Sequence, residues 1–146
     1  MIKVYLDTSV YNRLYHDQSQ INIFLEMQAT ISILNLIETQ KIQSVNSFVL
    51  EYENQKHPIP EQRNAVNEHL KKSNFKQLVN ESIKNRANQL EIEGIKPIDA
   101  LHVACFEASN CNYFLTCDQR LLNRCKSLSI QPINPIDFVK ELDNES

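Results

Sequence analysis

The stretch Ile2-Lys3-Val4-Tyr5-Leu6-Asp7-Thr8-Ser9 decides the fold that we predict. An apolar, β-branched run ends abruptly at a carboxylate, and Thr8 or Ser9 then offers an N-cap for a helix over Val10 to Tyr15. This pattern predicts a buried strand that delivers Asp7 to its C-terminal end. In open parallel sheets the ligand crevice lies at the carboxyl ends of the strands, so Asp7 is placed for chemistry. The alternative is that Asp7 only caps the following helix.

Composition narrows the class of protein. With 146 residues, of which 42% are hydrophobic, the chain suits one globular domain. The formal net charge of −3 gives the whole molecule no general attraction for nucleic acid or anionic lipid, so such binding must come from local patches. The sequence has no basic leader followed by an apolar core and no apolar run of membrane-spanning length. We therefore expect a cytoplasmic protein with no membrane association.

The cysteines and the single glycine exclude several kinds of site. The four cysteines form no CxxC pair, which disfavours a zinc ribbon or a thioredoxin-like redox site. Cys105 and Cys117 lie in apolar stretches and are expected to be small core residues. With Gly94 as the only glycine, the chain contains neither a GxGxxG fingerprint nor a GxxxxGK phosphate loop. Nucleotide cofactors are therefore disfavoured.

Strands alternate with helices along the rest of the chain. Ile21 to Thr39 has nearly helical periodicity and predicts a long amphipathic helix, and Lys41 to Ser47 predicts a strand parallel to the first. The later predicted elements are helices over Phe48 to Gln55 and Glu61 to Lys72, a strand over Phe75 to Val79, a helix over Ser82 to Glu93, a helix over Pro97 to Ala108, a strand from Tyr113 towards Cys117, a helix from Leu121, a strand over Leu128 to Ile133 and a helix from Asn134-Pro135 to Leu142. This order predicts an α/β fold, a three-layer α/β/α sandwich with a mainly parallel central sheet.

Four acids occupy corresponding places in this pattern. Asp118 follows the strand that begins at Tyr113 much as Asp7 follows the first, while Asp99 and Glu53 lie in the first turns of helices. Like charges brought together persist only with a cation or with raised pKa values, and clustered carboxylates suit Mg²⁺ or Mn²⁺ better than zinc. The reaction implied is hydrolysis of a phosphodiester bond with metal-activated water. Each acid by itself has a structural alternative, as a helix cap or a first-turn residue.

A family resemblance joins these features. The segments VYLDTSVYNR, SFVLEYEN, PIDALHVA, FLTCDQRLL and NPIDFVKEL occur in this order and resemble the successive motifs of PIN-domain proteins. The resemblance spans nearly the whole chain, although residues 56–94 carry no motif. It implies a PIN-like fold, a Mg²⁺- or Mn²⁺-dependent ribonuclease and an RNA substrate. The family also includes the toxins of toxin-antitoxin pairs, so an antitoxin protein is a candidate partner and a homodimer a candidate assembly.

Carried over residue by residue, the resemblance gives catalytic, metal-binding roles to the four acids Asp7, Glu53, Asp99 and Asp118. Glu51 is the alternative to Glu53, because two residues apart on a helix the two side chains point about 200° apart. His102 shares a helix face with Asp99 and is either a ligand or a packed, hydrogen-bonded histidine. Asp137 resembles a C-terminal signature and is expected to cap the last helix.

Substrate contacts are less evident in the sequence. Thr116 matches the family's hydroxyl residue, and Arg13 and Arg120 lie near the acids; these three are the predicted substrate-binding residues, with Arg124 on the same helix as Arg120. A solvated helix face explains the arginines equally well. Two other functions remain open: a non-catalytic RNA-binding or protein-interaction module with the same fold, and a phosphatase of the haloacid dehalogenase type. The phosphatase needs a second acid two residues after Asp7, where this chain has Ser9.

Overall fold

A parallel four-stranded sheet forms the centre of the protein. The computed structural model describes residues 1–145. The strands are β1 (Lys3–Leu6), β2 (Gln43–Ser47), β3 (Phe75–Gln77) and β4 (Tyr113–Leu115), in the order β3-β2-β1-β4. All three pairings are parallel, and Val4 pairs with Ser44 on one side and with Tyr113 on the other. The predicted parallel relation of the first two strands is confirmed.

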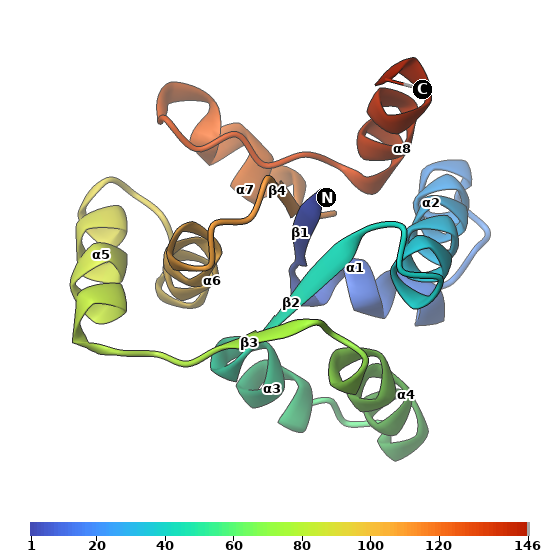
Figure 1. The fold of residues 1–146 in the computed structure, drawn as a ribbon, viewed down its shortest axis with the longest axis horizontal. Helices are drawn as coiled ribbons and strands as arrows, with labels where there is room; N and C mark the ends of the chain where they lie inside the picture. Colours follow the sequence, from blue (N-terminus) through green and yellow to red (C-terminus); the bar gives the residue numbers. More distant parts are fainter. Residues whose placement is uncertain (146) are drawn as a thin grey trace.

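Helices cover both faces of this sheet. They are α1 (Thr8–Asn12), α2 (Ile21–Glu38), α3 (Phe48–Gln55), α4 (Pro60–Lys71), α5 (Glu81–Ile92), α6 (Pro97–Ala108), α7 (Gln119–Arg124) and α8 (Pro135–Glu145), with short 3₁₀ turns η1 (Arg13–Tyr15) and η2 (Cys125–Ser127). Figure 1 shows α2 and α4 to the right of the strands and α5 and α6 to the left. This is the predicted three-layer α/β/α arrangement. In the part of the chain described, no helix is long and apolar enough to cross a membrane.

The central strand β1 is buried on both faces. Its consecutive residues Val4, Tyr5 and Leu6 are all 0% exposed, as expected where helices lie on both sides of a parallel sheet. The edge strand β3 is largely exposed. Cys105 and Cys117 are buried, as predicted for small core residues. The residue that follows β1 is therefore delivered from the middle of the core to the end of the sheet.

Local capping fixes where the helices begin. The expectation that Thr8 or Ser9 caps the first helix is wrong: α1 begins at Thr8, and the Asp7 carboxylate accepts a hydrogen bond from the backbone N–H of Ser9 at 3.0 Å. Asn134, not Asp137, caps α8, because its Oδ1 accepts from the N–H of Ile136 at 2.9 Å. Asp137 lies in the first turn of that helix instead.

Two other expectations from the sequence need correction. The strand predicted over Leu128 to Ile133 is reduced to one bridge between Ile133 and Leu115, since Pro132 has no N–H to continue a ladder. The helix α2 is not amphipathic in the expected way. Its outer face carries Ile21, which is 71% exposed, while its inner face buries Glu26 to 2% exposure. A partner for that buried carboxylate must therefore exist.

Candidate active site

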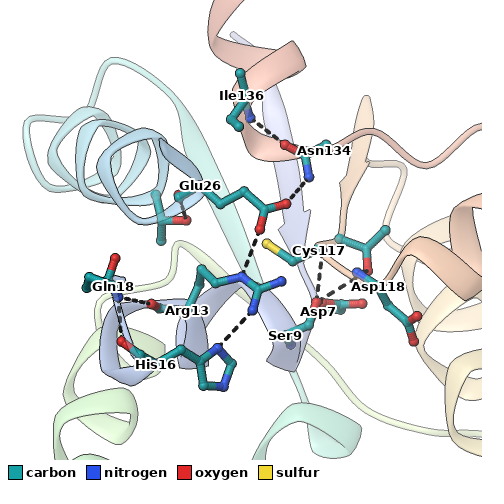
Figure 2. A network of polar contacts seen from close by, with 12 residues as sticks. Asp7, Ser9, Arg13, His16, Gln18, Glu26, Cys117, Asp118, Asn134 and Ile136 are labelled. Carbon is teal, nitrogen blue, oxygen red and sulfur yellow. Dashed lines mark hydrogen bonds and ion pairs between the residues drawn. The ribbon is translucent and has the colours of Figure 1, made fainter. Parts of the chain in front are cut away.

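The sheet brings the two strand-end acids together. Leu6, at the end of β1, pairs with Leu115 at the end of β4, and the N–H of Asp7 donates to the Leu115 carbonyl at 3.1 Å. Because the strands are adjacent and parallel, Asp7 and Asp118 both lie at the C-terminal end of the sheet. Figure 2 shows the two acid side chains beside each other.

Two hydroxyl groups tie these acids to the backbone. Ser9 Oγ donates a short hydrogen bond to Asp7 Oδ1, accepts from the N–H of Cys117 at 2.9 Å, and lies 3.3 Å from Thr116 Oγ1. Thr116 Oγ1 accepts from the N–H of Asp118 at 3.0 Å. Asp118 in turn caps α7 by accepting from the N–H of Arg120 at 2.9 Å. Asp7 and Asp118 are thus both helix caps, as the structural alternative predicted, and they also lie at the same end of the sheet.

The carboxylates act on one another electrostatically. Burial raises the pKa of Asp7, which is 5% exposed, against the opposing effects of His102, Ser9 and Thr116. Burial and the neighbouring charges of Asp7 and Asp118 raise the pKa of Asp99 to about 6. Glu53 adds to the negative field at both aspartates. The four acids singled out from the sequence therefore share one negative field at one end of the sheet.

Glu53 and Glu51 face different surroundings. Glu53 Oε1 accepts from Thr8 Oγ1 at 2.6 Å and forms a short contact with His102 Nε2. Burial would raise the pKa of Glu53, but the contacts with His102 and Thr8 outweigh it, and the pKa lies below its ordinary value. Glu51 pairs instead with Lys76 at 2.9 Å and with Asn46. Glu53 is thus the member of this pair that joins the acid cluster.

The cluster fits a divalent cation in charge and donor chemistry. Within residues 1–145, no lysine or arginine forms an ion pair with Asp7, Asp99 or Asp118. Uncompensated carboxylates of this kind suit hard, oxygen-preferring cations such as Mg²⁺ and Mn²⁺. Among the same residues, no group of three or more His, Cys, Asp or Glu side chains is already gathered closely enough to hold a metal ion. The acids are neighbours, but they are not preformed as a chelating set.

Arg13 lies beside the buried carboxylate of Glu26. Its Nε lies 2.9 Å from Oε1 of Glu26, and its Nη1 lies 3.0 Å from Nδ1 of His16. Asn134 donates a short hydrogen bond to the other Glu26 oxygen, Oε2 (Figure 2). The ion pair with Arg13 and the hydrogen bond from Asn134 offset the buried charge of Glu26 and link η1, α2 and the residue that caps α8, although Glu26 Oε1 itself accepts no hydrogen bond among the described residues. The Arg13 guanidinium is therefore engaged in holding helices together.

The other predicted substrate residues differ in exposure. Thr116 is 0% exposed, and its hydroxyl supports the acids instead of facing solvent. Arg120 is exposed on α7, two residues after Asp118. Arg124 donates to the Gly94 carbonyl at 2.8 Å. Of the arginines considered, Arg120 is the one that combines exposure with a place beside the cluster.

A large hollow lies next to the acids. Its volume is about 920 Å³, and its lining includes Arg13, Cys117, Gln119, Lys126, Asn134 and Lys140. None of the four clustered acids contributes to this lining, although Gln119 is the direct neighbour of Asp118. The hollow is thus adjacent to the cluster and carries its own basic side chains.

Sequence reasoning missed several supporting groups. Tyr5 was placed in an apolar strand, yet its hydroxyl lies 2.7 Å from His102 Nδ1. Ser9 was considered only as a cap, whereas its hydroxyl connects the ends of β1 and β4. Glu26 was counted within an amphipathic helix. A polar side chain inside an otherwise apolar run was the available signal, but its partners are distant in sequence.

Comparison with known proteins gives the family. The sequence profile described as "PIN domain" matches residues 4–127. The chain belongs to the PIN-domain family. No curated protein matches the sequence significantly.

Solved structures agree with this PIN fold. One is the DNA-bound VapBC from Salmonella typhimurium, with a TM-score of 0.56 and 15% identity, where the match covers 92% of this chain and 98% of that chain. Another is VapBC2 from Rickettsia felis bound to a DNA fragment from their promoter, with a TM-score of 0.58 and 14% identity over 91% and 98% of the two chains. At such identities the likeness concerns the fold alone. PIN-domain membership replaces the haloacid dehalogenase-type alternative.

Proposed function

We propose that this PIN-domain protein is a metal-dependent endoribonuclease that hydrolyses RNA phosphodiester bonds. The observation that carries the proposal is the convergence of acids at the carboxyl end of the sheet: Asp7 and Asp118 follow the paired strands β1 and β4, and Asp99 lies close enough for their charges to raise its pKa. Strongly perturbed acids clustered at the carboxyl end of a parallel sheet are typical of functional sites. The sequence segments that resemble PIN-family motifs contain these same acids.

Asp7, Glu53, Asp99 and Asp118 are the residues that would hold Mg²⁺ or Mn²⁺. When bound, the cation activates a water molecule and neutralises negative charge on the phosphate. Ser9 and Thr116 hold the two strand-end acids in place through their hydroxyl groups.

Substrate binding is assigned to the surface next to the acids. Arg120 is exposed beside Asp118 and is suited to hold a phosphate by a bidentate hydrogen bond. The hollow next to the cluster adds Lys126 and Lys140 to this surface, although Asp137 also lines it. Such local basic groups are needed because the chain as a whole has a net charge of −3.

The test is an RNA cleavage assay with purified protein. We expect cleavage in Mn²⁺ or Mg²⁺, none in EDTA, and none with Asp7→Asn, which keeps an oxygen to cap α1 but removes the charge. Circular dichroism of the variant checks that the fold is retained. Cleavage that continues in EDTA, or that Asp7→Asn leaves at the wild-type rate, would reject the proposal.

A non-catalytic RNA-binding or interaction module is the second candidate. It is favoured by the lack of a preformed chelating set among residues 1–145. This alternative predicts RNA binding in EDTA that Asp7→Asn leaves unchanged, with no cleavage under any metal condition.

The partner proposed for this chain is an antitoxin protein. The support is the likeness in fold to chains of VapBC complexes. Co-expression with the product of the adjacent gene, followed by co-purification and a cleavage assay of the complex, tests this role. We expect a stable complex in which cleavage is suppressed; a nuclease that neither binds nor is inhibited by that product has no antitoxin there.

A further inference from the structure

A chain of polar side chains runs through the core towards Glu53. Ser47 Oγ lies 2.7 Å from the Tyr5 hydroxyl, the Tyr5 hydroxyl lies 2.7 Å from His102 Nδ1, and His102 Nε2 contacts Glu53 Oε1. Ser47 and Tyr5 are 0% exposed and His102 is 2% exposed, whereas the Glu53 side chain is 31% exposed. These residues come from β2, β1, α6 and α3. These hydrogen-bonded side chains thus connect the centre of the sheet with one acid of the cluster.

The direction of the hydrogen bonds follows from what each group has to offer. Ser47 Oγ already accepts from the N–H of Leu50 at 3.1 Å, so its hydrogen is available to the Tyr5 oxygen. A tyrosine hydroxyl carries its proton at neutral pH, and that of Tyr5 can donate it to His102 Nδ1 at 2.7 Å. Nε2 then carries the imidazole hydrogen, which it donates to the Glu53 carboxylate.

If the hydrogen bonds ran in the opposite direction, His102 and Glu53 would repel each other. If neutral His102 carried its hydrogen on Nδ1, the lone pair of Nε2 would face the Glu53 carboxylate oxygen at short range. The direction that begins at Ser47 gives every member of the chain a donor opposite an acceptor. Hydrogen-bonded partners of this kind fix both the tautomer and the orientation of an imidazole.

The two carboxylate oxygens of Glu53 differ in their hydrogen-bond partners. Oε1 receives both Thr8 Oγ1, at 2.6 Å, and His102 Nε2. Oε2 has no hydrogen-bond partner among the residues that the structure describes. One oxygen is therefore held by the protein, and the other is left for a ligand.

We propose that Tyr5 and His102 are positioning residues: Tyr5 fixes the Nε2–H tautomer of His102, and His102 with Thr8 holds Glu53 by Oε1 so that Oε2 is presented to the cation. This proposal rests on the proposed function for its ligand, but its first half concerns the metal-free protein. Neither Tyr5 nor His102 touches the cation or the substrate in this scheme. Their effect on cleavage passes through Glu53.

The first measurement is the tautomer of His102 by long-range ¹H–¹⁵N NMR on protein with ¹⁵N-labelled histidine, in EDTA at pH 8. His102→Gln identifies the resonances among the four histidines. We expect the Nε2–H form in the wild type and a weaker preference for this tautomer in Tyr5→Phe, where only Glu53 still favours it. An Nδ1–H form or an imidazolium in the wild type would overturn the proposal, whether or not any variant folds.

The second measurement is Mn²⁺ affinity from the electron paramagnetic resonance signal of free Mn²⁺. Tyr5→Phe keeps the ring that stacks on Phe114 at 5.4 Å but removes the hydroxyl, and we expect it to weaken binding about 10-fold. The matched control is Tyr11→Phe, which alters a buried tyrosine that does not take part in these hydrogen bonds. This variant should leave the Mn²⁺ affinity unchanged. Equal loss in both variants, or none in Tyr5→Phe, overturns the positioning role alone. Absence of Mn²⁺ binding by the wild type overturns this role and the proposed function together.

Discussion

Two helices of this protein begin with the same three residues and have different surroundings. Pro97-Ile98-Asp99 opens α6, and Pro135-Ile136-Asp137 opens α8, with proline at the first helical position and the acid in the first turn in both. Locally the two acids are equivalent, since each lies where a negative charge favours the helix dipole.

The starts of α6 and α8 differ in their position relative to the sheet. Asp99 lies near Asp7 and Asp118, and burial together with those charges raises its pKa to about 6. Asp137 is exposed and lies beside Lys140 at the hollow next to the cluster. The same tripeptide thus gives an acid of the cluster in one place and a surface acid in the other. The strand order, which puts β4 beside β1, makes the difference.

The largest contrast is expected in catalysis. Loss of a residue that only supports a metal ligand typically costs 10- to 100-fold, so Asp99→Asn should lower Mn²⁺-dependent RNA cleavage by more than about 100-fold. Asp137→Asn should leave the rate within about 2-fold, because it removes a charge outside the cluster. Single-turnover cleavage rates at saturating Mn²⁺ measure both. Similar losses of cleavage rate in the two variants would show that the different surroundings of Asp99 and Asp137 do not matter for cleavage.

The response of stability to metal should separate the same pair. A ligand that binds only the folded state at a hundred times its dissociation constant adds about 2.7 kcal/mol to the free energy of unfolding. We expect Mn²⁺ to raise the melting temperature of the wild type and of Asp137→Asn alike, and to raise that of Asp99→Asn much less. Equal responses in all three proteins would place the bound ion elsewhere.

The pH dependence of stability tests the raised pKa of Asp99. The ordinary pKa of an aspartate is 3.8, and the pKa of Asp99 in the folded protein is about 6. Between pH 3.8 and pH 6 the folded state therefore binds more protons than the unfolded state. The contribution of Asp99 to stability is full below about pH 4 and is lost as the pH rises through about 6. In EDTA, Asp99→Asn should therefore become more stable relative to the wild type across this range. Urea unfolding at pH 4 to 7 measures this, and parallel curves would contradict it, with Asp137→Asn as the control.

Loss of the helix cap at Asp118 should have the smallest effect of the changes considered. Asp118 Oδ1 accepts from the N–H groups of Arg120 and Leu121, so Asp118→Ala should cost about 1 kcal/mol of metal-free stability. Asn caps nearly as well as Asp, and Asp118→Asn should change that stability by less than about 0.5 kcal/mol while removing cleavage. Thermal unfolding in EDTA beside the cleavage assay separates the two roles. If Asp118→Asn still cleaves RNA at the wild-type rate, Asp118 is only a cap.

The sequence was sufficient for features that depend on neighbours along the chain. The apolar run before Asp7 predicted a buried strand, and Pro97 and Gly94 marked the start of α6 and the end of α5 correctly, with Gly94 at a φ of 104°. It failed where partners are distant. The last predicted strand failed because Ile133 makes only one bridge to Leu115.

The same limit applies to the candidate site. Asp7, Asp99 and Asp118 were proposed because each follows a strand or starts a helix, and such positions can be read from local pattern. Glu53 was expected to open a helix too, but it lies in the second turn of α3, where Glu51 is the first-turn acid, and its choice came from the family resemblance. The contacts that support them join residues about a hundred positions apart, such as Ser9 with Cys117 and Tyr5 with His102. Arg13 was expected at the substrate because it follows Asp7, but its partner, Glu26, was hidden in the pattern of α2. Charge pairing in three dimensions cannot be read from spacing alone.

Anomalous diffraction from a crystal soaked in Mn²⁺ can show whether the four acids Asp7, Glu53, Asp99 and Asp118 form one cation site. We expect a manganese peak within coordinating distance of oxygens from Asp7, Asp99 and Asp118, with Glu53 bound directly or through water, and no peak at Asp137. A manganese peak at other residues, or none at these acids at saturating Mn²⁺, would show that the acids do not form the site.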